Sequence, residues 1–138
     1  MRTKLPILFV LLLLLLAACG DFQWLPDANP NVHIAPNQFT FVDKCAVPLN
    51  TDVVSDAITI AGINAPTLIS ITGGEYSIDN NATFTTANGT ITKDGQTVRV
   101  RPIGGKLTTA LPSAIITLTI GGVSATFKAT SDACLKTT

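Results

Sequence analysis

The chain has 138 residues, and its nine basic and nine acidic side chains leave it without net charge. That length suits one domain and is too short for two ordinary ones. Removal of the export signal described below would also remove Arg2 and Lys4, so the remaining 120 residues would carry a net charge near −2. Such a chain lacks the basic face that nucleic acid requires, and it has no strong acidic patch. We therefore expect no nucleic-acid partner.

The N-terminus has the order of parts that is typical of an export signal. Arg2 and Lys4 precede an uncharged apolar run of ten residues over 7–16, which the small residues Ala17 and Ala18 follow. A helix that crosses about 30 Å of hydrocarbon needs roughly 20 apolar residues. The run is too short for a permanent transmembrane helix, and we predict that residues 1–18 form a cleaved signal peptide.

The end of this signal, Leu16-Ala17-Ala18-Cys19, resembles the lipobox of bacterial lipoproteins at all four positions. The resemblance implies cleavage between Ala18 and Cys19, a diacylglyceryl group on the Cys19 thiol, and an acyl chain such as palmitate on the new amine. Each buried methylene contributes about 0.8 kcal/mol, and stable anchoring takes more than one chain. Apart from this covalent lipid we expect no cofactor. An ordinary secretory signal with a chance cysteine is the alternative.

The residue after Cys19 is Gly20. In enterobacterial lipoproteins an aspartate at that position tends to retain the protein in the inner membrane. The same resemblance therefore implies anchoring in the outer membrane, on either its periplasmic or its surface face.

Residues 19–37 are predicted to form a lipidated, irregular tether. Residues 20–36 show no hydrophobic periodicity, and they contain prolines that stiffen a chain and withhold amide donors, namely Pro26, Pro30 and Pro36. These seventeen residues span at most about 55–60 Å when fully extended. Three large side chains near the lipid would lie on the headgroups or pack on a protein surface: Phe22, Trp24 and Leu25.

From residue 38 the pattern changes to short runs in which apolar and polar residues alternate, as is typical of half-buried strands. The runs lie at 39–42, 58–61, 68–72, 75–78, around Phe84, 98–101, 116–120 and 123–128. Turn residues separate them, including Gly73-Gly74, Asn88-Gly89, Asp94-Gly95 and Gly121-Gly122, and Asn-Gly and Asp-Gly suit tight hairpins. About seven strands in roughly 95 residues predict an all-β antiparallel sandwich over 38–134, with a small barrel as the alternative. Residues 135–138 would be a C-terminal tail.

Several of these runs resemble an immunoglobulin-like module of bacterial envelope and secreted proteins. The resemblance lies in Phe39-Thr40-Phe41-Val42-Asp43 and in 55–63, 69–78 and 118–127, and it covers roughly 39–130. It implies an immunoglobulin-like sandwich but no particular function, because that fold hosts many. The chain departs from the module in having a single copy and a cysteine pair.

Cys45 and Cys134 are the cysteines that remain if Cys19 is lipidated. They flank the predicted domain, and an isolated pair in an exported protein usually forms a disulfide. Closing a loop of about 90 residues would stabilise the fold by up to roughly 4–5 kcal/mol. Free thiols or a metal pair are the alternatives. Two cysteines with one distant histidine make a poor zinc site, which needs four ligands, so we expect no metal there.

Residues with catalytic potential do not combine into a recognisable set. A hydrolase nucleophile needs a base within reach, yet the single histidine, His33, lies in the predicted tether and no serine has a G-x-S-x-G context. Glu75 and Asp79 could pair for acid–base work, but their spacing is ordinary for a surface. We therefore predict that the protein is not an enzyme.

Two polar groups remain as candidate binding residues. Asp79-Asn80-Asn81 offers the oxygen ligands that calcium prefers, although turns use the same residues. Arg99 and Arg101 share one side of a strand, where they would form a contact patch for an acidic partner or, as we favour, a solvated face.

These observations predict a lipid-anchored, non-catalytic envelope protein that serves as an interaction or scaffolding module or as an accessory subunit. We expect a protein partner and no small-molecule substrate. A surface-exposed adhesin or ligand-binding module is the alternative. One possible mode of contact is addition of a partner strand at a sheet edge, since few residues guard the edges: Lys128, Arg99 and Pro102.

Overall fold

The computed structural model describes residues 31–134. The chain divides into two units, Met1–Pro30 and Asn31–Thr138, and the described residues belong to the second. The predicted signal peptide, the cleavage site at Ala18 and Cys19, and the tail at 135–138 lie outside the described residues.

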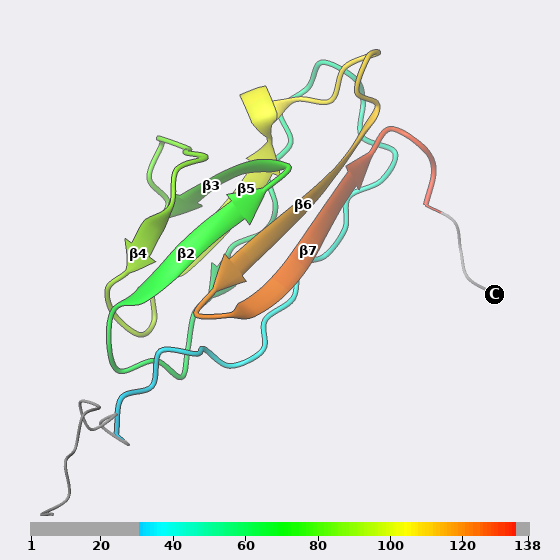
Figure 1. Ribbon diagram of the computed structural model, residues 1–138. Helices are drawn as coiled ribbons and strands as arrows, with labels where there is room; N and C mark the ends of the chain where they lie inside the picture. Colours follow the sequence, from blue (N-terminus) through cyan, green and yellow to red (C-terminus); the bar gives the residue numbers. More distant parts are fainter. Residues whose placement is uncertain (1–30, 135–138) are drawn as a thin grey trace, which may run out of the picture. The chain divides into compact units, whose positions relative to one another are not determined.

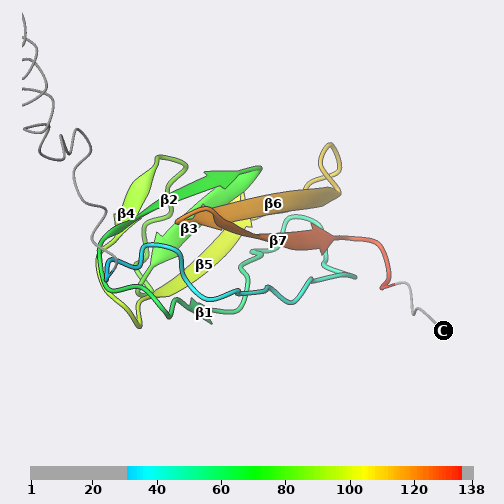
Figure 2. The ribbon, with the colours of Figure 1, turned by 60° about the horizontal axis from the view of Figure 1, so that its bottom comes forward.

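Residues 31–134 form an all-β, sandwich-like fold of two antiparallel sheets (Figure 1). The strands in chain order are β1 (Ile58–Thr59), β2 (Thr67–Thr72), β3 (Gly74–Ile78), β4 (Gly89–Ile91), β5 (Thr97–Pro102), β6 (Ser113–Ile120) and β7 (Val123–Thr130). One sheet has the order β1-β5-β3 and the other the order β4-β2-β6-β7. Figure 2 shows the two layers from below. The helical structure in this range is one short 3-10 turn, η1 (Ile103–Gly105). The predicted all-β class and antiparallel pairing are confirmed.

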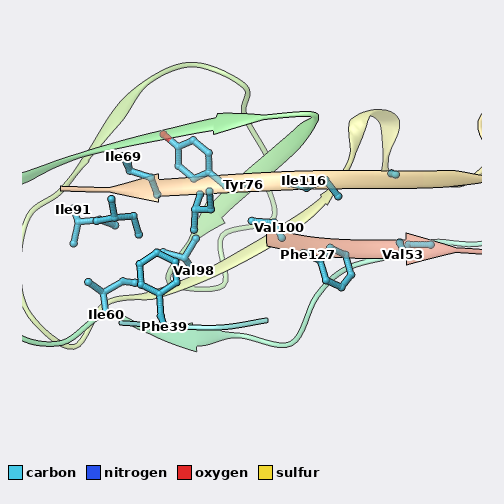
Figure 3. Packing of buried hydrophobic residues seen from close by; sticks show 14 of the residues in the cluster. Phe39, Val53, Ile60, Ile69, Tyr76, Ile91, Val98, Val100, Ile116 and Phe127 are labelled. Atoms are coloured by element: carbon cyan, nitrogen blue, oxygen red, sulfur yellow. The ribbon is translucent and has the colours of Figure 1, made fainter. Parts of the chain in front are cut away.

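The core lies between the sheets because alternate residues of each strand point inward. In β6 every second residue is buried, namely Ala114, Ile116, Leu118 and Ile120. β5 contributes Val98 and Val100 from the opposite sheet, and β7 contributes Phe127, whose side chain is fully buried. Figure 3 shows Ile116, Val100 and Phe127 among the buried residues packed between the two sheets. The period-two pattern therefore identified the inward face of these strands.

Two of the predicted strands do not form, and one strand was missed. Residues 39–42 are not a strand, although Phe41 packs against Phe127 with ring centroids 6.1 Å apart. Phe84 lies in a loop whose strand-like pairing with β3 is one isolated bridge between Thr85 and Tyr76. Conversely, β4 begins at Gly89, in a dipeptide predicted to be a turn. Alternation reports which side chains are buried, but a strand also needs a neighbouring backbone.

Some of the predicted turns join paired strands, whereas others carry the chain from one sheet to the other. Gly121 and Gly122 join β6 to β7 in a tight hairpin and have φ values of 54° and 85°, which glycine adopts without strain. Gly73 instead carries the chain from one sheet to the other, and a Cβ there would lie 2.2 Å from the Ile115 carbonyl oxygen. The Asp94-Gly95 turn also connects strands of different sheets, β4 and β5, so it closes no hairpin between them.

A segment at 44–47 runs beside β7 and covers the C-terminal part of its outer edge. Lys44 forms a parallel bridge with Ala129. The Lys44 N–H donates to the Lys128 carbonyl at 2.9 Å, and the Thr130 N–H donates to the Lys44 carbonyl at 2.9 Å. The Val47 N–H then donates to the Thr130 carbonyl at 3.1 Å. The C-terminal part of the β7 edge, at 128–130, is thus already paired.

The other edges are short or partly covered. At β3, Tyr76 and Thr85 exchange two backbone hydrogen bonds of 3.0 and 2.9 Å. β4 and β1 are edge strands of three and two residues. Arg99 and Pro102 lie on β5, which is the central strand of its sheet, so the prediction that they guard an edge is wrong. Strand addition would therefore be confined to short stretches of edge backbone.

Residues 31–37, which were assigned to the tether, are hydrogen-bonded to the sandwich. The Asn64 N–H donates to the His33 carbonyl at 2.9 Å, and the Asn37 N–H donates to the Ala61 carbonyl at 2.7 Å. The Thr67 hydroxyl donates to the Ile34 carbonyl at 2.6 Å. The folded unit therefore begins near residue 31, at the end of the sheets where β2 starts.

Candidate functional site

The predicted disulfide between Cys45 and Cys134 is confirmed. The two Cα atoms lie 5.3 Å apart, and the bridge spans a sequence separation of 89 residues. Cys45 belongs to the segment beside β7, and Cys134 follows the end of β7. The bond therefore ties the segment beside β7 to the chain that follows the end of that strand.

A hollow of about 470 Å³ opens beside the disulfide. Its charged lining consists of Lys44, Lys128, Asp43 and Asp132, so two ammonium groups balance two carboxylates. One of these carboxylates already serves the fold, since Asp43 accepts the Lys128 N–H at 2.8 Å. The volume suits a small ligand, but ligand sites are lined mainly by apolar and aromatic side chains. The lining therefore favours no particular ligand class.

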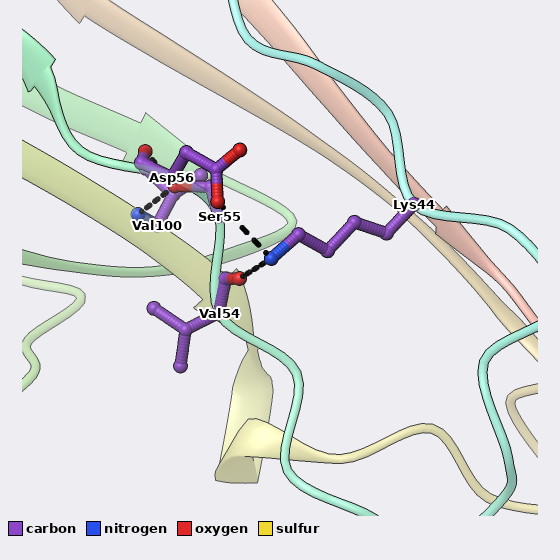
Figure 4. A network of polar contacts seen from close by, with 5 residues as sticks. All are labelled: Lys44, Val54, Ser55, Asp56 and Val100. Carbon is purple, nitrogen blue, oxygen red and sulfur yellow. Dashed lines mark hydrogen bonds and ion pairs between the residues drawn. The ribbon is translucent and has the colours of Figure 1, made fainter.

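Lys44 connects the two sheets along this side of the sandwich. Its ammonium group donates to the Val54 carbonyl at 2.7 Å and lies 3.4 Å from the Asp56 carboxylate. Next to them, Ser55 and Val100 exchange two hydrogen bonds of 2.8 and 3.0 Å, one through the serine hydroxyl. Figure 4 shows the lysine reaching from its own segment to this network. Lys44 therefore has a structural role, because it links the segment beside β7 to residues 54–56.

Arg99 and Arg101 lie on the outer face of the three-stranded sheet, but each is engaged there. Arg101 pairs with Glu75 across strands β5 and β3 at 2.7 Å, and its guanidinium carbon lies 4.0 Å from the Phe84 ring centroid. Their side chains are only 29% and 17% exposed. Arg99 donates to the side-chain oxygen of Asn80. Neither arginine is an open contact patch, nor the fully solvated face that we favoured.

The side-chain oxygens of the Asp79-Asn80-Asn81 turn already accept hydrogen bonds from other residues of the protein. Asp79 accepts hydrogen bonds from the Gln96 side chain at 2.8 Å and from the Thr97 N–H at 2.9 Å. These two contacts lower the pKa of the Asp79 carboxyl. The Arg99 guanidinium also donates to the side-chain oxygen of Asn80. This geometry favours a hydrogen-bonded turn over a calcium site. Glu75 and Asp79 each have a separate partner, so they do not form an acid–base pair.

The outer face of the four-stranded sheet is different, because its strands align hydroxyl side chains in rows. Thr72, Thr117 and Thr126 are register partners across β2, β6 and β7, and the next row is Ser70, Thr119 and Ser124. We call these six residues the hydroxyl face. The Thr119 and Ser124 hydroxyls lie 2.8 Å apart. The alternating threonines in the sequence signal such a face, but they do not reveal which strands become neighbours.

Apolar side chains lie at both ends of the hydroxyl face. Leu68 of β2 is 61% exposed and Ile115 of β6 is 64% exposed. Lys128, opposite Ile115, is the one charged residue among the outward-facing strand residues described for this sheet. This flat, nearly uncharged surface is the candidate contact site.

Within residues 31–134, no helix is long and apolar enough to cross a membrane. The same residues contain no group of three or more His, Cys, Asp or Glu side chains that could hold a metal ion. Comparison with models of known protein families gave no match. Comparison with curated proteins and with solved structures gave no match either.

Proposed function

We propose that this protein is a bacterial lipoprotein, anchored in the outer membrane through Cys19, whose folded unit serves as a non-catalytic interaction module or accessory subunit. The observation that carries the proposal is the use of the three cysteines. Cys45 and Cys134 are joined in a disulfide, which is typical of exported proteins. That pairing leaves Cys19, at the end of the signal sequence, as the cysteine to be lipidated.

The folded unit in this proposal is an immunoglobulin-like module. Its seven strands form antiparallel sheets of three and four, the strand numbers of a constant-type immunoglobulin sandwich, although the strands are distributed differently between the two sheets. The likeness of 39–130 to bacterial modules of that kind supports the same conclusion.

The anchor would hold this unit close to the bilayer. Hydrogen bonds of 31–37 to the sandwich leave residues 20–30 as the connection to Cys19. Eleven residues span at most about 36–40 Å in any conformation. The partner would therefore be a protein held at or near the same membrane.

The hydroxyl face is the contact surface that we favour. Strand addition is a weaker candidate, because the C-terminal part of the β7 edge is already paired with 44–47 and the edge strands β1 and β4 are short. Threonine and serine hydroxyls can both donate and accept hydrogen bonds, and Leu68 and Ile115 add exposed apolar area. A largely uncharged protein surface with complementary hydrogen-bonding groups would fit this face.

Replacing Cys19 with serine is expected to abolish lipid attachment, because the serine hydroxyl cannot replace the thiol in this modification. Palmitate labelling of the full chain should disappear, and the protein should leave the membrane fraction. The double variant Cys45→Ser/Cys134→Ser is the control and should keep its label. A Cys19→Ser protein that is processed normally and remains wholly in the membrane fraction would refute the anchor.

A photo-crosslinking side chain at Thr126 is expected to capture a partner in whole cells, because Thr126 is exposed on the hydroxyl face. The matched control is Thr59, which is also an exposed strand threonine but belongs to the three-stranded sheet. A crosslinked species that is strong from Thr126 and weak from Thr59 supports the proposed surface. Recovery of monomer alone from both positions would contradict it.

A further inference from the structure

An exposed turn between β3 and β4 contains the sequence Asn81-Ala82-Thr83. Asn-x-Ser/Thr is the acceptor sequence for N-linked glycosylation, which occurs on surface loops of exported proteins. We propose that Asn81 is an N-glycosylation site, modified by a membrane-bound oligosaccharyltransferase of the cell envelope. This inference rests on the proposed export of the chain.

The geometry of the turn presents the acceptor amide outward. The Asn81 side-chain oxygen accepts the Thr83 N–H at 3.0 Å. The Asn81 backbone is held on both sides, since its N–H donates to the Ile78 carbonyl at 3.1 Å and its carbonyl accepts the Ser77 hydroxyl at 2.6 Å. Among the described residues, the side-chain nitrogen of Asn81 makes no hydrogen bond, and residues 79–83 are all exposed.

The Thr83 hydroxyl is the other group that an acceptor sequence requires. Thr83 is exposed, and within residues 31–134 its hydroxyl makes no hydrogen bond. Its backbone N–H is occupied, but by the Asn81 side chain itself. The Asn81 side-chain amide and the Thr83 hydroxyl, the two groups that the transferase must recognise, are therefore both accessible on one short segment.

The chain contains a second such sequence, Asn88-Gly89-Thr90, which serves as an internal comparison. There the last two residues belong to β4, with Gly89 paired to Ile69 and Thr90 paired to Leu68. A Cβ added at Gly89 would lie 2.4 Å from the Tyr76 hydroxyl oxygen. Withdrawing this segment into an enzyme groove would break the sheet, so Asn81 is the better acceptor in the folded protein.

The proposed reaction is a group transfer from a lipid pyrophosphate-linked oligosaccharide. The Asn81 side-chain nitrogen forms a bond to the anomeric carbon of the first sugar, and the bond from that carbon to the pyrophosphate oxygen breaks. The leaving lipid pyrophosphate keeps the electron pair, and the nitrogen loses one proton to a base of the transferase. No electron transfer is involved.

The turn is also linked to the end of the folded unit that the chain enters. Asn64 contacts His33, Asp94 accepts the Ile63 N–H at 3.1 Å, and Gln96 contacts Asp79. With residues 20–30 as the only connection to a lipidated Cys19, Asn81 would remain near the membrane.

The test is mass spectrometry of the full chain purified from its native membranes, on the peptide that contains Asn81. We expect a glycan on that peptide and its complete loss in Asn81→Gln. Asn88→Gln is the matched control and should leave the glycan in place. Thr83→Val should remove the glycan because it lacks the hydroxyl, whereas Thr83→Ser should retain it.

Palmitate labelling of the same samples separates this inference from the proposed function. A labelled, membrane-bound wild-type chain whose Asn81 peptide is wholly unmodified would overturn the glycosylation site and leave the anchor standing. A glycosylated chain without label would overturn the anchor alone. A glycan that persists in Asn81→Gln, or that disappears only in Asn88→Gln, would also overturn the assignment.

Discussion

Replacing Cys45 and Cys134 together with serine is expected to lower the free energy of unfolding by about 4–5 kcal/mol. The bridge spans 89 residues, and in the chain-entropy model a loop of about that length stabilises by this amount, because the open chain gains conformational freedom only when unfolded. Single-domain stabilities are about 5–15 kcal/mol. The variant should therefore be marginally folded, and urea unfolding followed by circular dichroism measures the loss.

The wild-type chain in excess reductant provides the matched control. It should unfold at nearly the same urea concentration as the double variant, and reductant should not shift the variant further. The covered edge should be affected most, because Cys45 lies between Lys44 and Val47, whose backbone groups pair with β7. A loss below about 1 kcal/mol would show that the chain-entropy account does not apply here.

Phe127→Ala is expected to cost about 3–5 kcal/mol, which is the range for removing a large buried aromatic side chain. Phe127 is fully buried on β7 and touches Phe41, which precedes the segment beside that strand. The variant loses the transfer free energy of the ring, and it also leaves a cavity between the sheets that the close-packed core can fill only in part.

Val42→Ala is the matched control for this variant, because Val42 lies next to Phe41 in the sequence but is 71% exposed. Surface substitutions of this kind usually change stability by no more than about 0.5 kcal/mol. Urea unfolding of the two variants, measured with the disulfide intact, should separate them clearly. Equal effects at the two positions would mean that Phe127 is not part of the close-packed core.

The strands were predictable from the sequence wherever a segment with alternating buried residues also pairs with a neighbouring strand. In 98–101, 116–120 and 123–128 the alternation matches the observed strands, since a residue on one sheet face must be apolar and its neighbour polar. The same pattern misled at 39–42, where Phe39 is buried although the segment forms no strand. It also missed β4, which is only three residues long.

The polar candidates show a similar limit. The sequence places Arg99 and Arg101 on one side of a strand, and they do share the outer face of β5. It does not show that Glu75 is the register partner of Arg101 or that Phe84 covers it. Those contacts join residues from separate segments, so only the folded chain brings them together and turns a possible binding patch into a structural one.

The sequence by itself determined the all-β class and the inward faces of the longer strands, because these depend on local alternation. It also predicted the disulfide between Cys45 and Cys134, once Cys19 was taken as the lipidated cysteine. Only the tertiary structure decided which strands share a sheet, which edges are covered and where the threonines align into the hydroxyl face. The physical reason is that sheet pairing depends on contacts between distant segments, and no local pattern records which of several similar strands lies next to another.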